Sequence, residues 1–304
     1  DADRADRLSR DYNDRYNSIV DWEPDGSHLT MPGMNPDRPL RPHQKNAIWR
    51  CLQGNTLLAH VVGSGKTMIM GGAAMEARRL GLAHKVVVEM PNMLVAQCER
   101  EMRRMYPTAR ILVPTAKDFE PVNRREFLNR IMTDDWDMVL LAESQMSRIQ
   151  NHKEAQEAFI QEQIDEYEQI LLEAGDKMDK TTRKDLEKKL KNLEKKLEEI
   201  MARLEDKEEV YWEDLGVDMI IVDEAERHKN LRFVTAMNRI RGLPNSHSDR
   251  AMSMFLKTRD VMKRTGGRRG VVFATGTPIA NSNAELWTQM RYLAPDLMEQ
   301  LGLN

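Results

Sequence analysis

Residues 56–67, which read TLLAHVVGSGKT, decide the fold of this chain. The apolar run at 56–61 is typical of a buried strand, and Gly63-Ser64-Gly65-Lys66-Thr67 follows it, ahead of a helical pattern. In such a strand–loop–helix unit, small residues let backbone N–H groups close around phosphate oxygens, and the helix N-terminus adds its positive dipole end. We therefore expect a nucleotide-binding loop in which Lys66 reaches the β- and γ-phosphates and Thr67 holds Mg²⁺.

One position departs from the strict phosphate-loop pattern. That pattern has Gly or Ala five residues before Gly65, where this chain has His60. The strand before the loop and the helix after it support the phosphate-loop interpretation despite this difference.

A second motif supplies two acidic side chains. The apolar run at 219–222 ends in Asp223 and Glu224. Because the carboxyl ends of parallel strands meet at one edge of a sheet, these carboxylates are expected beside the phosphate loop. Asp223 is the candidate Mg²⁺ ligand, through water, and Glu224 is the candidate base that orients and deprotonates an attacking water. Lys66, Asp223 and Glu224 are therefore the predicted catalytic residues.

A third motif, Thr275-Gly276-Thr277-Pro278, follows the apolar run at 270–274. Hydroxyl groups beside a Gly turn can hydrogen-bond the acids of the second motif. We expect Thr275 and Thr277 to couple the state of the γ-phosphate to a neighbouring domain.

Six apolar runs are predicted as strands, and helical patterns separate them. They lie at residues 56–61, 85–89, 110–113, 138–141, 219–222 and 270–274. Several are apolar throughout rather than alternating, which is typical of strands buried on both faces. The prediction is an α/β fold, a parallel sheet with helices on both faces.

Residues 151–213 interrupt this alternation with two predicted helices. Apolar residues recur there at spacings of four and three, first at Ile160, Ile164, Tyr167, Leu171 and Ala174, then at Leu186, Leu190, Leu193, Leu197, Ile200 and Leu204. Gly175 and Asp176 separate the two runs, and Thr182 with Asp185 resembles a capping box for the second helix. This pattern predicts an inserted antiparallel coiled-coil hairpin. Its partner is DNA or another protein, or the hairpin is a solvated spacer.

The rest of the chain divides into an arm and a lobe. Residues 1–39 form a predicted N-terminal arm, charged and helical at first and then extended because several Pro and Gly residues break any helix. Residues 40–150 and 214–304 form the predicted nucleotide-binding lobe around the hairpin.

Charge is unevenly distributed along the 304 residues. The formal net charge is −3, but residues 151–213 alone carry about −7, so the remainder is about +4. A mildly basic body is compatible with a nucleic-acid face and equally with a solvated surface that has no partner. The acidity of the hairpin argues against a direct grip on phosphate.

Cysteine content and hydropathy exclude several other classes. Two cysteines, Cys51 and Cys98, provide neither a zinc-site spacing nor a disulfide framework. No run of 18 apolar residues predicts a membrane span, and the charged N-terminus is unlike a signal peptide. We expect a cytoplasmic protein, of a bacterial or phage-infected cell.

Together the motifs resemble the core of helicase superfamily 2, and more closely its Swi/Snf-like translocases of double-stranded DNA. The resemblance implies the first of two RecA-like lobes, with ATP and Mg²⁺ as ligands and duplex DNA as partner. It assigns Gln44 to adenine, and it assigns Asn92 and Ser144, which each follow a predicted strand, to the DNA backbone. Asn281 after the third motif also fits, whereas Glu226 stands where the family usually has His.

A narrower resemblance concerns the run Asp25-Gly26-Ser27-His28-Leu29-Thr30. It is similar to large phage- and plasmid-borne proteins that join a DNA methylase domain to a Swi/Snf-like helicase and are implicated in antirestriction. The chain begins at Asp1 rather than Met, and too few residues follow Pro278 for a second lobe. We expect a piece of a longer polypeptide whose second lobe supplies an arginine finger. The candidates Arg239, Arg241, Arg268 and Arg269 are expected to make surface or lobe contacts instead.

The sequence thus predicts the ATP-binding lobe of an ATP-dependent DNA helicase or translocase. Without the arginine finger, the isolated chain is expected to bind nucleotide weakly and to hydrolyse it slowly or not at all. Two alternatives stay open. A nucleotide-gated binding module with little or no hydrolysis would not need the base Glu224, and an RNA helicase lobe fits the Swi/Snf-like motifs less well.

Overall fold

The computed structural model describes residues 2–13, 22–174, 178–203, 209–231, 248–279 and 284–302. One sheet contains all the strands of this part, and every pairing in it is parallel. The strands are β1 (Thr56–Ala59), β2 (Val86–Met90), β3 (Ile111–Leu112), β4 (Met138–Ala142), β5 (Met219–Asp223) and β6 (Val271–Thr275). Their order is β1-β6-β5-β2-β4-β3. Each predicted strand is present, and the parallel α/β fold is confirmed.

Both faces of the sheet are buried, as the continuous apolar runs predict. In β5, Ile220 and Val222 belong to one hydrophobic core, whereas Met219 and Ile221 belong to the other. Successive side chains of a strand point to opposite faces, so a strand needs apolar residues throughout when helices cover both sides.

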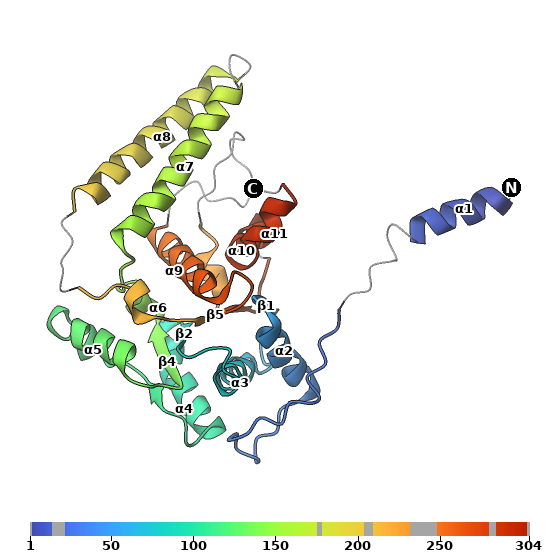
Figure 1. The fold of residues 1–304 in the computed structure, drawn as a ribbon, viewed down its shortest axis with the longest axis vertical. Coiled ribbons are helices and arrows are strands. Elements are labelled where there is room, and N and C mark those ends of the chain that lie inside the picture. The colour runs from blue at the N-terminus through green and yellow to red at the C-terminus, as the bar shows by residue number, and fades with distance from the viewer. Residues whose placement is uncertain are drawn as a thin grey trace.

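Helices cover both faces of the sheet (Figure 1). The first face is covered by α2 (Pro42–Gln53), α3 (Lys66–Arg79) and α4 (Val95–Met105). The second face is covered by α5 (Pro121–Thr133), α9 (Asp249–Thr265) and α10 (Ala284–Leu293). Short elements complete the lobe: 3₁₀ turns η2 (Asn92–Leu94), η3 (Lys117–Phe119), η5 (Glu213–Leu215) and η6 (Ala225–His228), with α6 (Glu143–Met146) and α11 (Pro295–Gln300).

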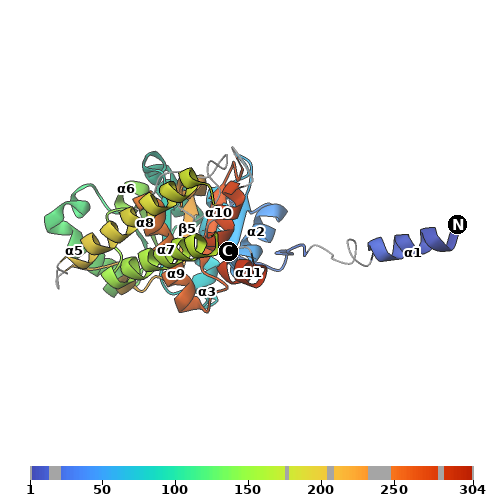
Figure 2. The same cartoon turned by 90° about the horizontal axis from the view of Figure 1, so that it is seen from above.

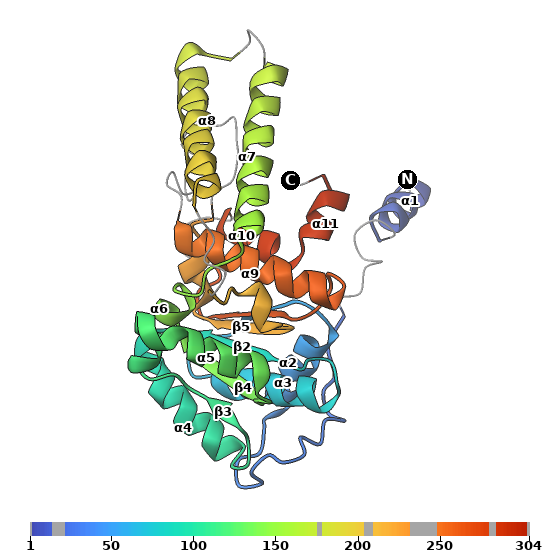
Figure 3. The ribbon, with the colours of Figure 1, turned by 60° about the vertical axis from the view of Figure 1, so that its left-hand side comes forward.

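Helices α7 (Lys153–Ala174) and α8 (Lys180–Met201) form the predicted hairpin, which stands away from the sheet (Figure 3). Lys153 Nζ, at the start of α7, donates to the Met201 carbonyl at the end of α8 over 2.8 Å, so the helices are antiparallel. The N-cap of α8 is Asp179, whose carboxylate accepts from the Thr181 and Thr182 amides. The capping box predicted at Thr182 is therefore wrong, because Thr182 already lies inside the helix. Gly175, Asp176 and Leu204 of the predicted seam lie outside the described residues.

The arm contacts the lobe through its second half. Helix α1 (Ala2–Tyr12) lies apart from the body, as Figure 2 shows. Leu29 and Met31 are buried, and Lys45 Nζ of α2 donates to the Leu29 carbonyl over 2.7 Å. No described helix is long and apolar enough to cross a membrane.

Candidate nucleotide-binding and coupling site

The phosphate loop connects β1 to α3. Gly63 and Gly65 have φ of 83° and 86°, a left-handed conformation that favours Gly, and α3 begins at Lys66 immediately afterwards. Lys66 Nζ donates to the His60 carbonyl over 3.2 Å. Burial, then electrostatic interaction with His43 and with the Lys66 ammonium, lowers the pKa of His60, which favours a neutral imidazole there. The loop thus has the curvature that phosphate binding needs.

Gln44 of α2 contacts this loop through its side chain. Its side chain is only 4% exposed, and its Nε2 donates to the Ser64 carbonyl over 3.1 Å, while its Oε1 accepts from the Arg41 amide over 2.9 Å. A Cβ placed on Gly65 would lie 2.2 Å from Gln44 Nε2. Gln44 therefore supports the loop directly, and its predicted contact with adenine stays a prediction.

Asp223 ends β5 close to Lys66. Burial raises the pKa of Asp223, while the Glu224 amide and the charge of Lys66 lower it. Its Oδ1 is buried without a hydrogen-bond partner in the described chain, and so is Ser64 Oγ. Buried polar atoms without partners require explanation, and a hydrated Mg²⁺ on a nucleotide phosphate would provide partners for oxygens of this kind. Thr67, the second residue of α3, is half-buried. The residues fit a Mg²⁺–nucleotide, and the individual ligands stay predictions.

Glu224 has an unusual backbone and an unusual acidity. Its φ of 53° is left-handed, which is uncommon for a residue other than Gly and occurs at sites where the surroundings impose it. A hydrogen bond with Glu226, then burial and the negative charge of Glu226, raise the pKa of Glu224 to about 7. A carboxylate whose pKa lies near neutrality is suited to accept a proton from water.

The third motif meets the second as expected. Asp223 is level with Ala274 in the β5–β6 ladder, so Thr275 lies just beyond it. Thr275 Oγ1 donates to Glu226 Oε2 over 2.7 Å and accepts from the Thr277 amide over 3.0 Å. A hydroxyl–acid hydrogen bond is thus present for Thr275, but its acceptor is Glu226 rather than Asp223 or Glu224. Thr277 contributes its backbone to this relay, and its side chain is exposed.

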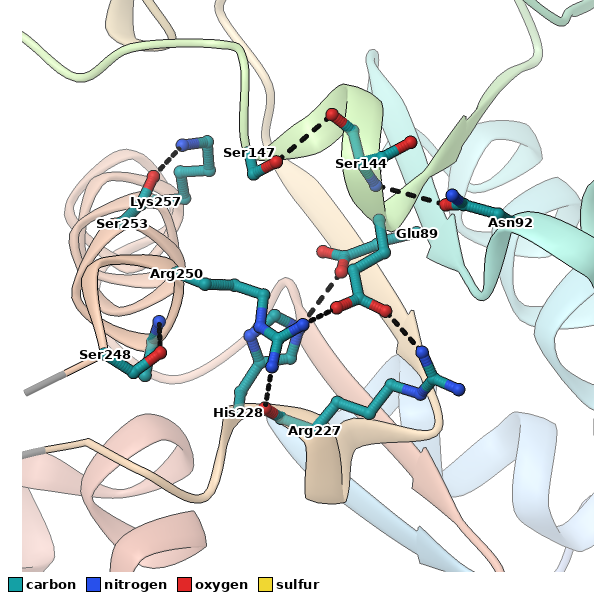
Figure 4. Close-up of polar contacts among 12 residues, drawn as sticks. Glu89, Asn92, Ser144, Ser147, Arg227, His228, Ser248, Arg250, Ser253 and Lys257 are labelled. Atoms are coloured by element: carbon teal, nitrogen blue, oxygen red, sulfur yellow. Dashed lines mark hydrogen bonds and ion pairs between the residues drawn. The ribbon is translucent and has the colours of Figure 1, made fainter. Parts of the chain in front are cut away.

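Asn92 and Ser144 lie on the other half of the same sheet edge. They follow the neighbouring strands β2 and β4, and Asn92 Oδ1 accepts from the Ser144 amide over 3.2 Å (Figure 4). Both side chains are exposed. The two residues predicted to contact DNA are thus brought together, and their role stays a prediction.

Next to this pair lies a partly buried polar cluster that was not predicted from the sequence. Glu143 forms ion pairs with Arg227 of η6, over 2.6 Å, and with Arg250 of α9. His228 Nε2 lies 3.0 Å from Glu89 Oε1, and both side chains are buried (Figure 4). Glu89 could have indicated this cluster in the sequence. It is a charged residue inside a strand that is buried on both faces, and such a residue needs a buried partner.

Two of the four arginine candidates, Arg268 and Arg269, lie away from the site. Arg268 and Arg269 precede β6, at the sheet edge opposite to the phosphate loop, where the Arg268 carbonyl accepts from the Asn55 amide. Arg239, Arg241 and Asn281 lie outside the described residues.

Residues 49–304 match the family model described as "Probable helicase domain". This chain belongs to that family. Over 350 residues, the helicase domain is 23% identical to "Defense against restriction protein B" of Escherichia phage P1, an alignment that covers 99% of this chain and 15% of that protein. The domain therefore spans a small part of its phage relative.

Solved structures similar to the helicase domain include an ATPase core and another helicase domain. The "SWI2/SNF2 ATPase core in complex with dsDNA" of Sulfolobus solfataricus has a TM-score of 0.48 at 17% identity, with 90% of this chain and 39% of that chain covered. The "Hef helicase domain" of Pyrococcus furiosus has a TM-score of 0.46 at 16% identity, with coverage of 84% and 36%. The helicase assignment made from the sequence motifs is confirmed by the family match, and these neighbours are of the Swi/Snf-like and helicase kinds.

Proposed function

We propose that this helicase domain is the ATP-binding lobe of a DNA translocase. The observation that carries the proposal is the convergence of three motifs at the carboxyl ends of the adjacent strands β1, β6 and β5. Lys66 acts on the acidity of both Asp223 and Glu224, and a Cβ on Gly276 would lie 3.6 Å from Lys66 Nζ. Phosphate ligands, a metal ligand and a base therefore lie within one site.

The residues divide the chemistry between them. Backbone amides of residues 63–67 and Lys66 hold the phosphates, and Thr67 and Asp223 hold Mg²⁺, which neutralises charge on the β- and γ-phosphates when bound. Glu224 orients a water molecule and accepts its proton. Glu226, hydrogen-bonded to both Glu224 and Thr275, passes the protonation state of the base to the turn after β6.

The exposed surface around the site supports a second lobe as partner. Val61 and Val62 of the phosphate loop are 73% and 88% exposed, and Ile279 after the third motif is 45% exposed. A Cβ on Gly276 would lie 3.4 Å from Val62 Cγ2, so the two motifs share this apolar rim. An opposing lobe that covers the rim would exclude water and supply an arginine to the phosphates.

Duplex DNA is the proposed track, along the edge that contains Asn92 and Ser144. The Swi/Snf-like motifs support DNA over RNA. The name of the phage P1 relative supports a role in defence against restriction, in the cytoplasm of an infected bacterium. Retention of Glu224 supports hydrolysis over a purely nucleotide-gated binding module.

Fluorescent ATP binding and ATP turnover, each with and without duplex DNA, single-stranded DNA or RNA, test the proposal. Lys66→Ala is expected to lose binding, whereas Glu224→Gln is expected to keep binding and lose any turnover. Absence of ATP binding by the wild-type chain at millimolar concentration would contradict the proposed site, and stimulation by RNA alone would assign the lobe to an RNA helicase.

A further inference from the structure

Charge is divided between the two helices of the hairpin. Helix α7 carries seven Asp and Glu side chains and one Lys, whereas α8 carries eight Lys and Arg and five Asp and Glu. Taken as one unit the hairpin is acidic, which argued against contact with phosphate. The folded hairpin instead presents an acidic helix and a basic helix, with net charges of −6 and +3.

The basic residues of α8 form a stripe along its outer face. Lys184, Lys188 and Lys191 are exposed, and their spacing of four and three places them on one side of the helix. Leu186 and Leu193 are buried on the opposite side. Within the described residues, none of these three ammonium groups has a carboxylate within 4.0 Å. The charge of the stripe is therefore available to a partner.

The C-terminal half of α8 lines a groove of about 680 Å³ between the hairpin and the lobe. Its walls are mostly polar. Asn192 and Lys195 come from α8, Ser147 and Gln150 follow α6, and Arg250 comes from the first turn of α9. Lys195 lies four residues after Lys191 on the same side of α8, so the row of lysines continues into the groove. There Lys195 pairs with Glu199 over 3.7 Å and Lys196 pairs with Asp249 over 2.7 Å, so in this row the lysines without carboxylate partners among the described residues are those of the stripe.

The groove adjoins the proposed DNA edge. Ser147 Oγ, on its wall, donates to the Ser144 carbonyl over 3.1 Å, and Ser144 in turn contacts Asn92 (Figure 4). Arg250, on the same wall, pairs with Glu143, the residue before Ser144. One continuous polar surface thus runs from Asn92 through the groove to the outer face of α8.

We propose that this groove and the Lys184/Lys188/Lys191 stripe bind the sugar–phosphate backbone of the duplex on which the lobe acts. The inference rests on the proposed function, and it makes the hairpin a clamp for DNA. Lysines without carboxylate partners and neutral amide and hydroxyl groups are the side chains that contact phosphates without reading bases. An acidic protein segment is the competing partner, and the test includes it.

The test measures binding of a fluorescent 30-base-pair duplex to the full chain by anisotropy, at several salt concentrations. The variant Lys184→Glu/Lys188→Glu/Lys191→Glu is expected to bind at least about tenfold more weakly, with the salt slope reduced by roughly one per lost phosphate contact. Lys→Gln at the same three positions keeps helix propensity and replaces the Glu variant if that variant fails to fold. It should also weaken duplex binding and reduce the salt slope. Circular dichroism and ATP binding verify the fold of each variant.

The matched control changes net charge equally on another exposed helix. Arg4→Glu/Arg7→Glu/Arg10→Glu in α1, where these side chains are exposed, should leave affinity within about twofold. An equal loss in this control, or unchanged affinity and slope in the α8 variants, would overturn the clamp. Full displacement of DNA by polyglutamate at matched charge would also overturn it, in favour of an acidic protein partner.

The proposed function can fail separately. If the wild-type chain binds ATP but no duplex at low salt, the DNA-translocase assignment fails with the clamp. If Asn92→Ala/Ser144→Ala weakens DNA binding and the α8 variants do not, the result would support DNA binding at the Asn92/Ser144 edge and contradict the clamp.

Discussion

Thr275 Oγ1 donates a hydrogen bond to Glu226 Oε2 over 2.7 Å and thereby joins the turn after β6 to the acidic segment after β5. Glu226 is also the main neighbour of the proposed base Glu224: a protonated Glu224 carboxyl can donate a hydrogen bond to it, which raises the pKa of Glu224. The position that holds His in similar proteins therefore holds an acid here, and that acid links the base to the third motif. We propose that a change in the protonation or occupancy of the site reaches Thr275 through this one carboxylate.

Replacing Thr275 by Val removes the hydroxyl from this link and keeps the shape of the side chain. We expect ATP affinity to change less than about twofold. DNA-stimulated turnover, measured with the proposed second lobe present, should fall about tenfold, because one uncompensated hydrogen bond to a carboxylate corresponds to about 1.5–3 kcal/mol. Thr277→Val is the comparison, since Thr277 contributes only its amide to the relay. Equal effects of the two substitutions would contradict a relay through the Thr275 hydroxyl.

Replacing Glu226 by Gln should change the pH dependence of the base. Glu224 acts as a carboxylate, and its raised pKa of about 7 predicts turnover that increases as pH rises through neutrality. The substitution removes the negative neighbour, so the pKa of Glu224 falls and the rise moves to lower pH. Carbon-13 NMR of labelled Glu carboxyl groups measures this without turnover, with Glu224→Gln identifying the resonance. A pKa that stays near 7 in Glu226→Gln would assign the shift to burial instead.

The two glycines of the phosphate loop should respond differently to alanine. Gly65→Ala places a Cβ against Gln44 at a left-handed φ, and we expect ATP affinity to fall by at least about thirtyfold. Gly63 has a similar φ, but an added Cβ would have nothing within 4 Å. Gly63→Ala should therefore weaken the free energy of ATP binding only by the backbone strain, about 1 kcal/mol. Titration with fluorescent ATP measures both. Partial recovery in Gly65→Ala/Gln44→Ala would assign the excess to the clash.

Lys257 of α9 is fully buried and should be important for stability. Its ammonium donates to the Ile149 carbonyl, to Asn151 Oδ1 and to Ser253 Oγ over 2.9, 3.2 and 2.5 Å. Lys257→Met removes all three hydrogen bonds, although Asn151 Oδ1 still accepts from Ser253 Oγ over 3.2 Å. The free energy of unfolding in urea should therefore fall by about 2–4 kcal/mol. Lys263→Met, at an exposed position of the same helix, should change it by less than about 0.5 kcal/mol.

The same side chain makes a prediction about pH. Burial lowers the pKa of Lys257 from 10.5 to about 8. Between these values the unfolded chain binds the proton and the folded chain does not, so the stability of the wild type relative to Lys257→Met should rise from pH 8 to pH 10. A difference that stays constant over this range would indicate that Lys257 remains charged in the folded protein.

Short sequence patterns predicted much of the fold and of the candidate site. The continuous apolar runs predicted all six strands, because burial on both faces requires apolar residues at every position. The left-handed glycines before Lys66 and the acids that end β5 also follow from local pattern, since a phosphate loop and a strand end each depend on residues adjacent in the chain.

Tertiary structure alone decided the long-range pairings. Glu89 and His228 are 139 residues apart in sequence, and Glu143 and Arg250 are 107 apart, yet each pair meets because the strand order brings β2, β4 and β5 together. The charge of the hairpin illustrates the same limit. Composition over residues 151–213 sums to an acidic segment, but folding the chain back places acidic α7 and basic α8 beside one another, and electrostatic contact depends on position in space rather than on the sum along the chain.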